Sequence, residues 1–349
     1  MSGVELAGLD SAGMLATVQG SPLQWAEALE RARHAPPPPV SVDDVRAVVL
    51  IGMGGSGIAA DVAVVAAAER GRVPVIPVKG YELPGWVGPD TLVVAVSYSG
   101  STEETLAACD AAGAAGAPRY AVTAGGELAR RAAREGFPTV SVPAGGQPRA
   151  NMPSLTVAVL AGLESAGVLD GMLDQLASVP DHLVGCLDRW AAADPVDDLA
   201  DALDGLIPVF YGARGWPAVV ALRGKCQVNE NAKRPAFCHE LPERDHNEIV
   251  GWGAASDAGA RFAIVDVRSP ADEHPQVRRR FSLIRQSLSD RVGTHVTIEM
   301  EGDSSVTRFA AGVLLVDLLS VRLAYLGRED PTPVRAIEAL KRRLAETAP

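Results

Sequence analysis

Short apolar runs alternate with longer amphipathic stretches over residues 47–142 of the chain. The apolar runs predict strands at Ala47–Ile51, Val73–Val78, Leu92–Val96, Arg119–Val122 and Thr139–Val142. The stretches between them have helical spacing and predict helices at Ile58–Arg70, Glu103–Ala112 and Glu127–Glu135. Such an alternation of strands and helices is typical of a parallel sheet that helices cover on both faces.

A second and weaker round of the same pattern follows. Strands are expected at Pro208–Gly212, Phe262–Val267 and His295–Met300, and helices at Ala218–Lys233, Gln276–Leu288, Val306–Tyr325 and Val334–Ala345. Residues 151–194 have helical spacing throughout. Near the N-terminus, a short helical pattern over Leu23–Ala32 is followed by Pro36–Pro39, which stops a helix. The shared rhythm indicates an internal duplication.

These patterns predict an α/β protein with two doubly wound domains, each a mainly parallel sheet flanked by helices. The expected parts are an N-terminal extension (1–40), a first domain (41–155), a helical linker (156–200) and a second domain with C-terminal helices (201–349). A chain of 349 residues is longer than one ordinary core supports, which agrees with two domains.

Two turns of small residues follow two strands of the first round. Gly52-Met53-Gly54-Gly55-Ser56-Gly57 comes after the first strand, and Ser97-Tyr98-Ser99-Gly100-Ser101-Thr102 comes after the third. Each turn leads into a helix, whose N-terminal N–H groups and dipole favour an anion. Glycine lets the backbone approach a ligand closely, and hydroxyl groups add donors. We therefore expect a phosphate site made by Gly54, Gly55, Ser56, Ser97, Ser99 and Thr102.

The residues of these turns also fit other interpretations. Ser101 and Glu104 fit a capping box, which stabilises a helix without any ligand. The first turn also fits G-x-G-x-x-G, but Lys79-Gly80 stands where a dinucleotide-binding carboxylate is expected. The second round has Arg268-Ser269-Pro270 in place of a serine-glycine turn, so only the first domain is expected to bind phosphate.

Titratable side chains are dense over residues 229–248. Glu230 falls near the end of a predicted helix, where the negative end of the dipole is expected to raise the pKa of a carboxyl group, as suits a general base. His246 lies in a segment with two prolines, which predicts a shaped loop. The alternative is a solvated charged loop. Cys238, His239 and His246 lack a recognised metal-ligand spacing, so no metal site is expected.

Composition narrows the possible partners. The net charge of −11 argues against a nucleic-acid surface, but a local positive site for a small anion remains compatible with it. Arg149 could supply that charge, or it could be a solvated loop arginine. The four cysteines have no metal-type spacing and no signal-peptide pattern precedes them, which predicts a reduced cytoplasmic protein. No apolar run was expected to reach the roughly 20 residues that span a membrane.

Together these segments resemble the bifunctional phosphoglucose/phosphomannose isomerase family, which is built on two sugar isomerase (SIS) domains. The resemblance rests on both small-residue turns, Pro148-Arg149-Ala150, Asn229-Glu230-Asn231, residues 245–251, and Asp330-Pro331-Thr332-Pro333-Val334 running to Leu340-Lys341. It implies a cofactor-independent enzyme that interconverts glucose 6-phosphate, mannose 6-phosphate or both with fructose 6-phosphate through a cis-enediolate.

The resemblance also implies a role for each matching residue. Ser56, Ser97, Ser99, Thr102 and Arg149 would hold the sugar 6-phosphate, and Thr332 would lie near the sugar. Glu230 would be the base, Lys341 would stabilise charge on the substrate oxygens, and His246 would assist ring opening from the neighbouring subunit of a homodimer. Ser101 stands where asparagine is common in the family, and serine also suits a helix N-terminus.

Two alternatives stay open at this point. One is a non-catalytic SIS protein that senses a sugar phosphate, because phosphate turns suit both a sensor and an enzyme. The other is an isomerase restricted to one epimer or to a related substrate such as an amino sugar phosphate.

Overall fold

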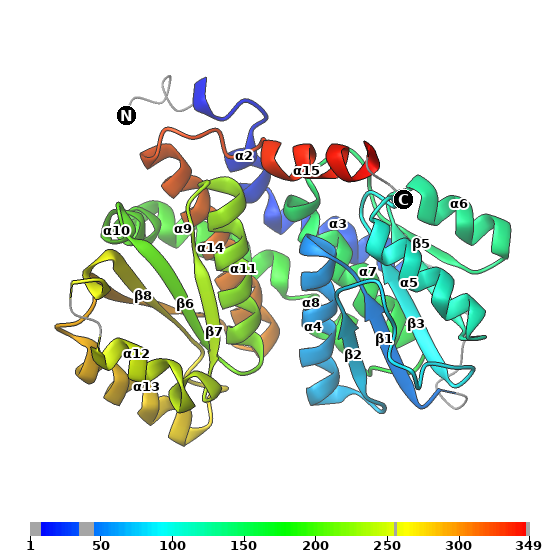
Figure 1. The fold of residues 1–349 in the computed structure, drawn as a ribbon, viewed down its shortest axis with the longest axis horizontal. Coiled ribbons are helices and arrows are strands. Elements are labelled where there is room, and N and C mark those ends of the chain that lie inside the picture. The colour runs from blue at the N-terminus through cyan, green and yellow to red at the C-terminus, as the bar shows by residue number, and fades with distance from the viewer. Residues whose placement is uncertain (1–7, 35–44, 255–256, 347–349) are drawn as a thin grey trace.

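The computed structural model describes residues 8–34, 45–254 and 257–346, so Pro36–Pro39 lie outside the described residues. Two sheets with their own helices stand side by side, and a layer of helices joins them (Figure 1). The chain therefore has the predicted fold class, two parallel sheets flanked by helices.

The first sheet contains five parallel strands in the order β2-β1-β3-β4-β5. The strands are β1 (Ala47–Ile51), β2 (Val75–Val78), β3 (Thr91–Val96), β4 (Arg119–Thr123) and β5 (Thr139–Ser141). Helices α4 (Gly54–Arg70) and α7 (Met152–Ser165) pack on one face, and α5 (Glu103–Ala114) and α6 (Gly126–Glu135) pack on the other. Because helices cover both faces, β3 is buried along its whole length.

The second sheet contains four parallel strands in the order β7-β6-β8-β9. They are β6 (Ile207–Ala213), β7 (Phe237–Leu241), β8 (Phe262–Arg268) and β9 (Thr294–Glu299). Helices α11 (Trp216–Asn231) and α14 (Ser305–Leu326) face the first domain, and α12 (Glu248–Ala254) and α13 (Pro275–Leu288) cover the outer face. The strands β6, β7 and β8 occupy the places of β1, β2 and β3, which agrees with a duplication.

Strand β7 was not predicted, because its sequence Phe-Cys-His-Glu-Leu was interpreted as part of a charged loop. It is an edge strand and most of its side chains are only partly buried, so its sequence does not have the apolar character of a central strand. The loop interpretation of residues 229–248 is therefore wrong for Phe237–Leu241. His246 itself ends a short 3-10 helix, η3 (Glu243–His246).

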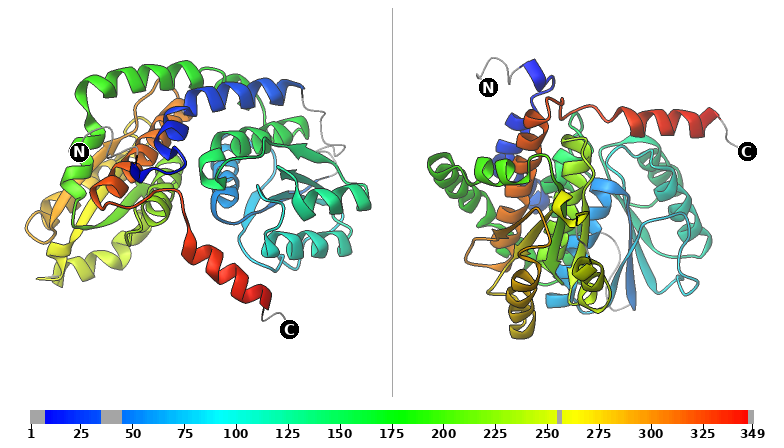
Figure 2. Two further views of the ribbon diagram at one scale, coloured as in Figure 1. Left: turned by 90° about the horizontal axis from the view of Figure 1, so that it is seen from above. Right: turned by 60° about the vertical axis from the view of Figure 1, so that its left-hand side comes forward.

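One hydrophobic core joins the two domains. It contains residues of α4 and α7 from the first domain and of α11 and α14 from the second. The N-terminal helices α2 (Met14–Gln19) and α3 (Ser21–His34) contribute to it, and Trp25 of α3 is fully buried. Helices α8 (Met172–Leu176), α9 (Val179–Ala193) and α10 (Pro195–Leu203) complete the layer seen from above in Figure 2.

Helix α14 contradicts the expectation that no apolar run is long enough to cross a bilayer. The helix has 22 residues and contains a window of 18 residues with a mean hydropathy of 1.8, which satisfies the length and composition of a membrane span. However, 89% of its apolar window is buried inside the protein. A helix that is apolar on all sides is expected at the centre of a large core, and this is where α14 lies.

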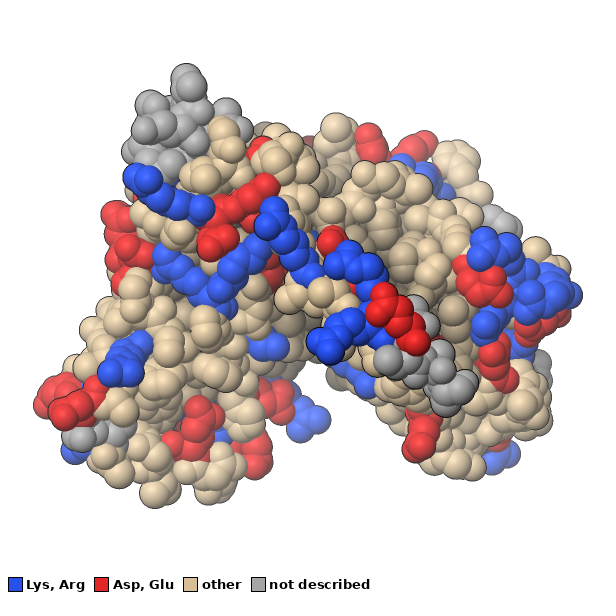
Figure 3. Space-filling view, turned by 45° about the horizontal axis from the view of Figure 1, so that its top comes forward, with Lys and Arg blue, Asp and Glu red and all other residues tan. Residues whose placement is uncertain are grey.

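Helix α15 (Arg335–Glu346) extends outward from the rest of the chain (Figures 1 and 2). Its apolar side chains Ile337 and Leu340 are exposed, in contrast to those of α14. The helix also carries Arg335, Lys341, Arg342 and Arg343. Lys and Arg side chains gather along this side of the molecule in Figure 3, although the chain as a whole is acidic. A local positive surface of this kind attracts anionic ligands.

Candidate active site

The two small-residue turns lie next to each other at one edge of the first sheet. Helix α4 begins at Gly54 just after β1, and α5 begins at Glu103 just after β3. The strand order of the sheet reverses between the neighbouring strands β1 and β3. In doubly wound sheets, ligands bind outside the carboxyl ends of the strands at such a reversal. The fold thus brings the two predicted turns together at the expected ligand site.

Neither helix N-terminus is capped by a side chain. The N-cap residues Met53 and Thr102 make no side-chain cap hydrogen bond. The capping box predicted for Ser101 and Glu104 is therefore wrong, because the helix begins one residue later than that motif requires. The first N–H groups of both helices are left without a side-chain acceptor, which favours an anion there.

Hydroxyl groups connect the two turns. Ser56 Oγ accepts a hydrogen bond from Tyr98 N at 3.2 Å, across 42 residues of sequence. Ser97 Oγ and Thr102 Oγ1 are 2.9 Å apart, and Ser99 is exposed. The backbone of Gly54 has a φ of +54°, a conformation that glycine adopts easily.

Gly55 packs against the segment that carries Arg149. A Cβ atom on this glycine would lie only 3.2 Å from the carbonyl oxygen of Pro148. The 3-10 helix η2 (Pro148–Asn151) therefore lies directly against the first turn of α4. This contact places the backbone of Arg149 beside the first of the two predicted phosphate turns.

Arg149 is buried, with 3% of its surface exposed, so the interpretation as a solvated loop arginine is wrong. Its Nε donates to Asn231 Oδ1 at 2.7 Å. Its Nη2 donates to the carbonyl oxygens of Pro331 at 2.8 Å and Thr332 at 2.7 Å. The guanidinium thus extends from the first domain to residues of the second. Burial lowers the pKa of Arg149, and the neighbouring Glu230 acts in the opposite direction.

Glu230 lies in the last turn of α11, as the sequence predicted. Its Oε2 is 3.7 Å from Arg149 Nη1, and 27% of its side chain remains exposed. It lines a cavity of about 500 Å³ together with Asn229, Lys233, Glu329, Asp330, Pro333, Val334, Arg335, Ala336 and Ile337. The partly exposed carboxylate at this cavity is therefore accessible to a bound ligand, as a general base has to be.

Lys233 is a residue of this site that the sequence analysis missed. Its Nζ donates to the carbonyl oxygens of Glu230 at 2.6 Å, Asn231 at 3.2 Å and Pro331 at 3.0 Å. It therefore closes the C-terminus of α11, where a cation complements the helix dipole. Burial lowers the pKa of Lys233. A lysine as the last residue of the predicted helix Ala218–Lys233 was the available signal.

Thr332 is buried beside Arg149. Its N donates to Asp330 Oδ1 at 3.0 Å, and its carbonyl oxygen accepts from Arg149. Its hydroxyl is buried without a hydrogen-bond partner among the described residues. An unpaired buried hydroxyl is costly unless another group binds it, so the position suits a contact with a polar ligand.

His246 and Glu230 lie at opposite ends of the second domain within one chain. Glu230 ends the 16-residue helix α11, which begins near the carboxyl end of β6. His246 follows the carboxyl end of the adjacent strand β7, so the length of α11, about 24 Å at 1.5 Å per residue, separates the two residues. In Figure 1, α12 follows His246 at the lower end of the domain, far from α15. A single chain does not bring these residues together.

Lys341 is exposed on the outer part of α15, one turn beyond the Ile337 that lines the cavity. It is not among the residues that line the cavity beside Glu230. The described residues also contain no group of three or more His, Cys, Asp or Glu side chains placed to hold a metal ion. Cys238 and His239 are consecutive residues of β7, and His246 lies beyond its end.

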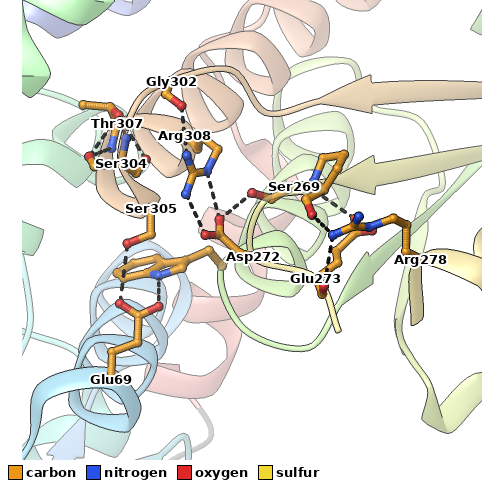
Figure 4. Close-up of polar contacts among 12 residues, drawn as sticks. Glu69, Ser269, Asp272, Glu273, Arg278, Gly302, Ser304, Ser305, Thr307 and Arg308 are labelled. Carbon is orange, nitrogen blue, oxygen red and sulfur yellow. Dashed lines mark hydrogen bonds and ion pairs between the residues drawn. The ribbon is translucent and has the colours of Figure 1, made fainter. Parts of the chain in front are cut away.

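In the second domain, the loop that corresponds to the small-residue turn after β3 contains carboxylates of the chain itself (Figure 4). The loop follows β8, which has the place of β3. Glu273 Oε1 accepts from the N–H of Ser269 at 3.0 Å and pairs with Arg268, and Asp272 pairs with Arg308 at 2.6 Å. The negative charges are supplied by the chain itself, so an added phosphate would be repelled there.

Two families of domains match the chain. Residues 42–162 match the SIS domain, and residues 192–344 match the bacterial phospho-glucose isomerase C-terminal SIS domain. Among solved structures, the C-terminal domain of glucosamine-fructose-6-phosphate aminotransferase from Francisella tularensis has a TM-score of 0.71 at 14% identity, covering 92% of this chain and 97% of its own. Tagatose-6-phosphate ketose/aldose isomerase from Escherichia coli has a TM-score of 0.68 at 14% identity, covering 91% and 94%. These likenesses establish the fold.

Curated relatives are similar over most of the chain. The bifunctional phosphoglucose/phosphomannose isomerase of Caldicellulosiruptor bescii is 35% identical over 88% of this chain and 92% of its own. The protein of the same name from Aquifex aeolicus is 34% identical over 87% and 92%. A D-glucosamine-6-phosphate 4-epimerase from Sulfolobus acidocaldarius is 34% identical over 72% and 76%. These similarities show that the chain belongs to the bifunctional phosphoglucose/phosphomannose isomerase family.

Proposed function

We propose that this chain is a cofactor-independent isomerase that interconverts glucose 6-phosphate and mannose 6-phosphate with fructose 6-phosphate. The observation that carries the proposal is the pair of Glu230 and the buried Arg149, 3.7 Å apart, with the backbone of Arg149 packed against the uncapped first turn of α4. The arrangement offers a base, a cation and an anion site in one place. The relatives named above support the same reaction.

The phosphate would bind at the N-termini of α4 and α5. Ser56, Ser97, Ser99 and Thr102 would donate hydroxyl hydrogen bonds to it, and the backbone of Gly54 and Gly55 would permit its close approach. The phosphate is remote from the reacting carbons, so its binding energy can be used to orient them.

Glu230 would remove the proton from C2 and return a proton to C1. Because C1 and C2 are neighbours in a planar cis-enediolate, one carboxylate can serve both carbons. Glucose 6-phosphate and mannose 6-phosphate differ only at C2, so both give the same enediolate. A site with one base and no contact that selects the C2 configuration accepts both sugars.

Arg149 was expected to bind the phosphate, and we propose a different role that its contacts support. Its Nε and Nη2 groups bind Asn231, Pro331 and Thr332. Its Nη1 donates to Gln147 Oε1 at 3.4 Å and lies 3.7 Å from Glu230 Oε2. A fixed cation beside the base would stabilise the negative charge that develops on the enediolate oxygens. Thr332, bound to the same arginine, is placed to contact the sugar.

The enzyme would act as a homodimer whose sites are shared. His246 is too far from Glu230 to serve the same site within one chain, so it would come from the partner subunit to assist ring opening. Lys341, on the outward helix α15, would reach the substrate oxygens only after this helix packs against the rest of a dimer. We place the enzyme in the cytoplasm, because all four cysteines are free.

The 4-epimerase from Sulfolobus acidocaldarius favours a second candidate, an activity on an amino sugar phosphate. The two candidates are distinguished by the substrate. A protein of the first kind converts mannose 6-phosphate and glucose 6-phosphate, whereas one of the second kind converts only glucosamine 6-phosphate. A sensor would bind fructose 6-phosphate and convert none of these sugars.

Replacement of the proposed base, Glu230, tests whether this residue acts in the chemical step or in substrate binding. Glu230→Gln is expected to lower kcat by about 10²–10⁴-fold, because the amide cannot accept the C2 proton. The affinity for sorbitol 6-phosphate, which cannot isomerise, should change less than about threefold, because the phosphate turns are untouched. A coupled assay and calorimetry measure the two effects.

Glu329→Gln, a change in the same cavity, is the control and should retain activity. Equal losses in both variants would contradict the role of Glu230.

Removal of hydroxyl groups from the second turn tests the phosphate site. Ser97→Ala with Thr102→Val is expected to raise KM about 10²–10⁴-fold, because each of the two lost hydrogen bonds to a charged group is worth about 1.5–3 kcal/mol in binding. The effect on kcat should be smaller. The matched control is Ser101→Ala in the same turn, since Ser101 was not assigned to the phosphate. Steady-state kinetics that show equal KM values for both variants would exclude this site.

Mixed subunits test the shared active site. Glu230→Gln and His246→Ala should each be inactive alone. When they are unfolded and refolded together, half of the dimers are mixed and carry one intact site, so about a quarter of wild-type activity should return. If both residues served a site within one chain, every site would keep one defect and no activity would return.

A further inference from the structure

A buried polar network connects α14 to the arginine beside the base. Asp317 of α14 accepts from Arg223 of α11 through two bonds, Nε–Oδ1 at 2.8 Å and Nη2–Oδ2 at 2.6 Å. Gln227 of α11 donates to the same carboxylate at 3.0 Å. Only 2% of Arg223 and 7% of Asp317 is exposed. The ion pair is therefore inside the core that joins the two domains.

Two hydrogen-bonded routes connect this ion pair to Arg149. In the first, Arg223 Nη2 also donates to the carbonyl oxygen of Arg149 at 2.8 Å. In the second, Ser320 Oγ donates to the carbonyl oxygen of Asp317 at 2.6 Å and accepts from Asn231 Nδ2 at 2.8 Å. Asn231 Oδ1 then accepts from Arg149 Nε at 2.7 Å. The main chain and the side chain of Arg149 are thus both held from α14.

Stability alone does not account for such a pair. Two charges lose their hydration on burial, and apolar side chains of similar volume commonly stabilise a core as well or better. Burial raises the pKa of Asp317, which reflects this cost, although Arg223 and Gln227 act against it. What an apolar pair could not supply is the hydrogen bond to the Arg149 carbonyl oxygen and the fixed geometry that follows from it.

We propose that Asp317 and Arg223, together with Asn231 and Ser320, are positioning residues that hold Arg149 beside Glu230. The inference rests on the proposed isomerase function of this site. Arg149 belongs to the first domain, and the residues that hold it belong to the second. The network therefore also sets the distance from the phosphate turns on one domain to the base on the other.

The expected effect is on the chemical step and not on phosphate binding. The network contacts Arg149, but among the described residues none of its hydrogen bonds reaches Ser56, Ser97 or Thr102. A displacement of about 1 Å at a catalytic group can cost about 100-fold in rate. If the network only stabilised the fold, its removal would lower the free energy of unfolding. It would not lower kcat while leaving the affinity for the ligand unchanged.

The test is the double variant Arg223→Met/Asp317→Leu in the full-length chain. It removes both buried charges together, so the fold should persist with a Tm near that of the wild type. We expect kcat for fructose 6-phosphate to fall at least about tenfold, while the Kd for sorbitol 6-phosphate changes less than about threefold. The matched control is Arg308→Met/Asp272→Leu, an ion pair of α14 in Figure 4 that does not touch Arg149. Its kcat should stay within about twofold.

Each outcome decides for or against the proposal. A folded double variant with unchanged kcat overturns it, as does an equal loss of kcat in the control. If the double variant fails to fold, Ser320→Ala replaces it. This smaller change breaks the route through Asn231 and should lower kcat severalfold with an unchanged Kd. An unchanged kcat there would overturn the proposal.

If the proposed isomerase function is wrong, the wild-type protein converts no sugar phosphate. This result is distinct from a failure of the positioning proposal, which concerns only the variants. In that case a crystal structure of the double variant decides the inference without turnover. Arg149 Nη1 displaced from its position 3.7 Å from Glu230 Oε2 would support it, and an unmoved Arg149 would overturn it.

Discussion

The contact of Arg149 with the second domain is the interaction on which the site depends. One buried guanidinium binds Asn231, Pro331 and Thr332 and lies 3.7 Å from Glu230. Its own segment packs against the first turn of α4. Without this contact, the anion site of one sheet and the carboxylate of the other would have no fixed relation. A buried charge with unsatisfied donors is costly, so the arginine also makes separation of the two domains unfavourable.

The two sheets share the order of their first three strands, but the loops at corresponding positions have opposite character. After β1 and β3, the helix N-termini have no side-chain caps and lie beside hydroxyl groups. After β8, Asp272 and Glu273 supply the negative charge, and Arg268 and Arg308 neutralise it within the protein. In the proposed function, the first domain keeps an open anion site, whereas carboxylates of the chain occupy the corresponding position of the second domain. The second domain would contribute the base instead, Glu230, from the far end of α11.

The sequence predicted those features that depend on local pattern. Strand β3 and the turn at residues 97–102 could be identified because a buried parallel strand is uniformly apolar and the turn has unusual composition. Strand β7 was missed because an edge strand needs no apolar run. The capping box was wrong by one residue. The partners of Arg149 could not be predicted, since Pro331 is 182 residues away in the chain. The separation of His246 from Glu230 also required the topology of the second sheet.

In the proposed mechanism, one carboxylate moves a proton between neighbouring carbons of a hexose 6-phosphate. The first measurement to make is the isomerisation of mannose 6-phosphate and of glucose 6-phosphate in D2O, followed by NMR. We expect both sugars to give fructose 6-phosphate with solvent deuterium at C1, because a proton held by Glu230 at an open cavity exchanges with water between the two transfers. Fructose 6-phosphate formed without any solvent deuterium, or no product from either sugar, would contradict it.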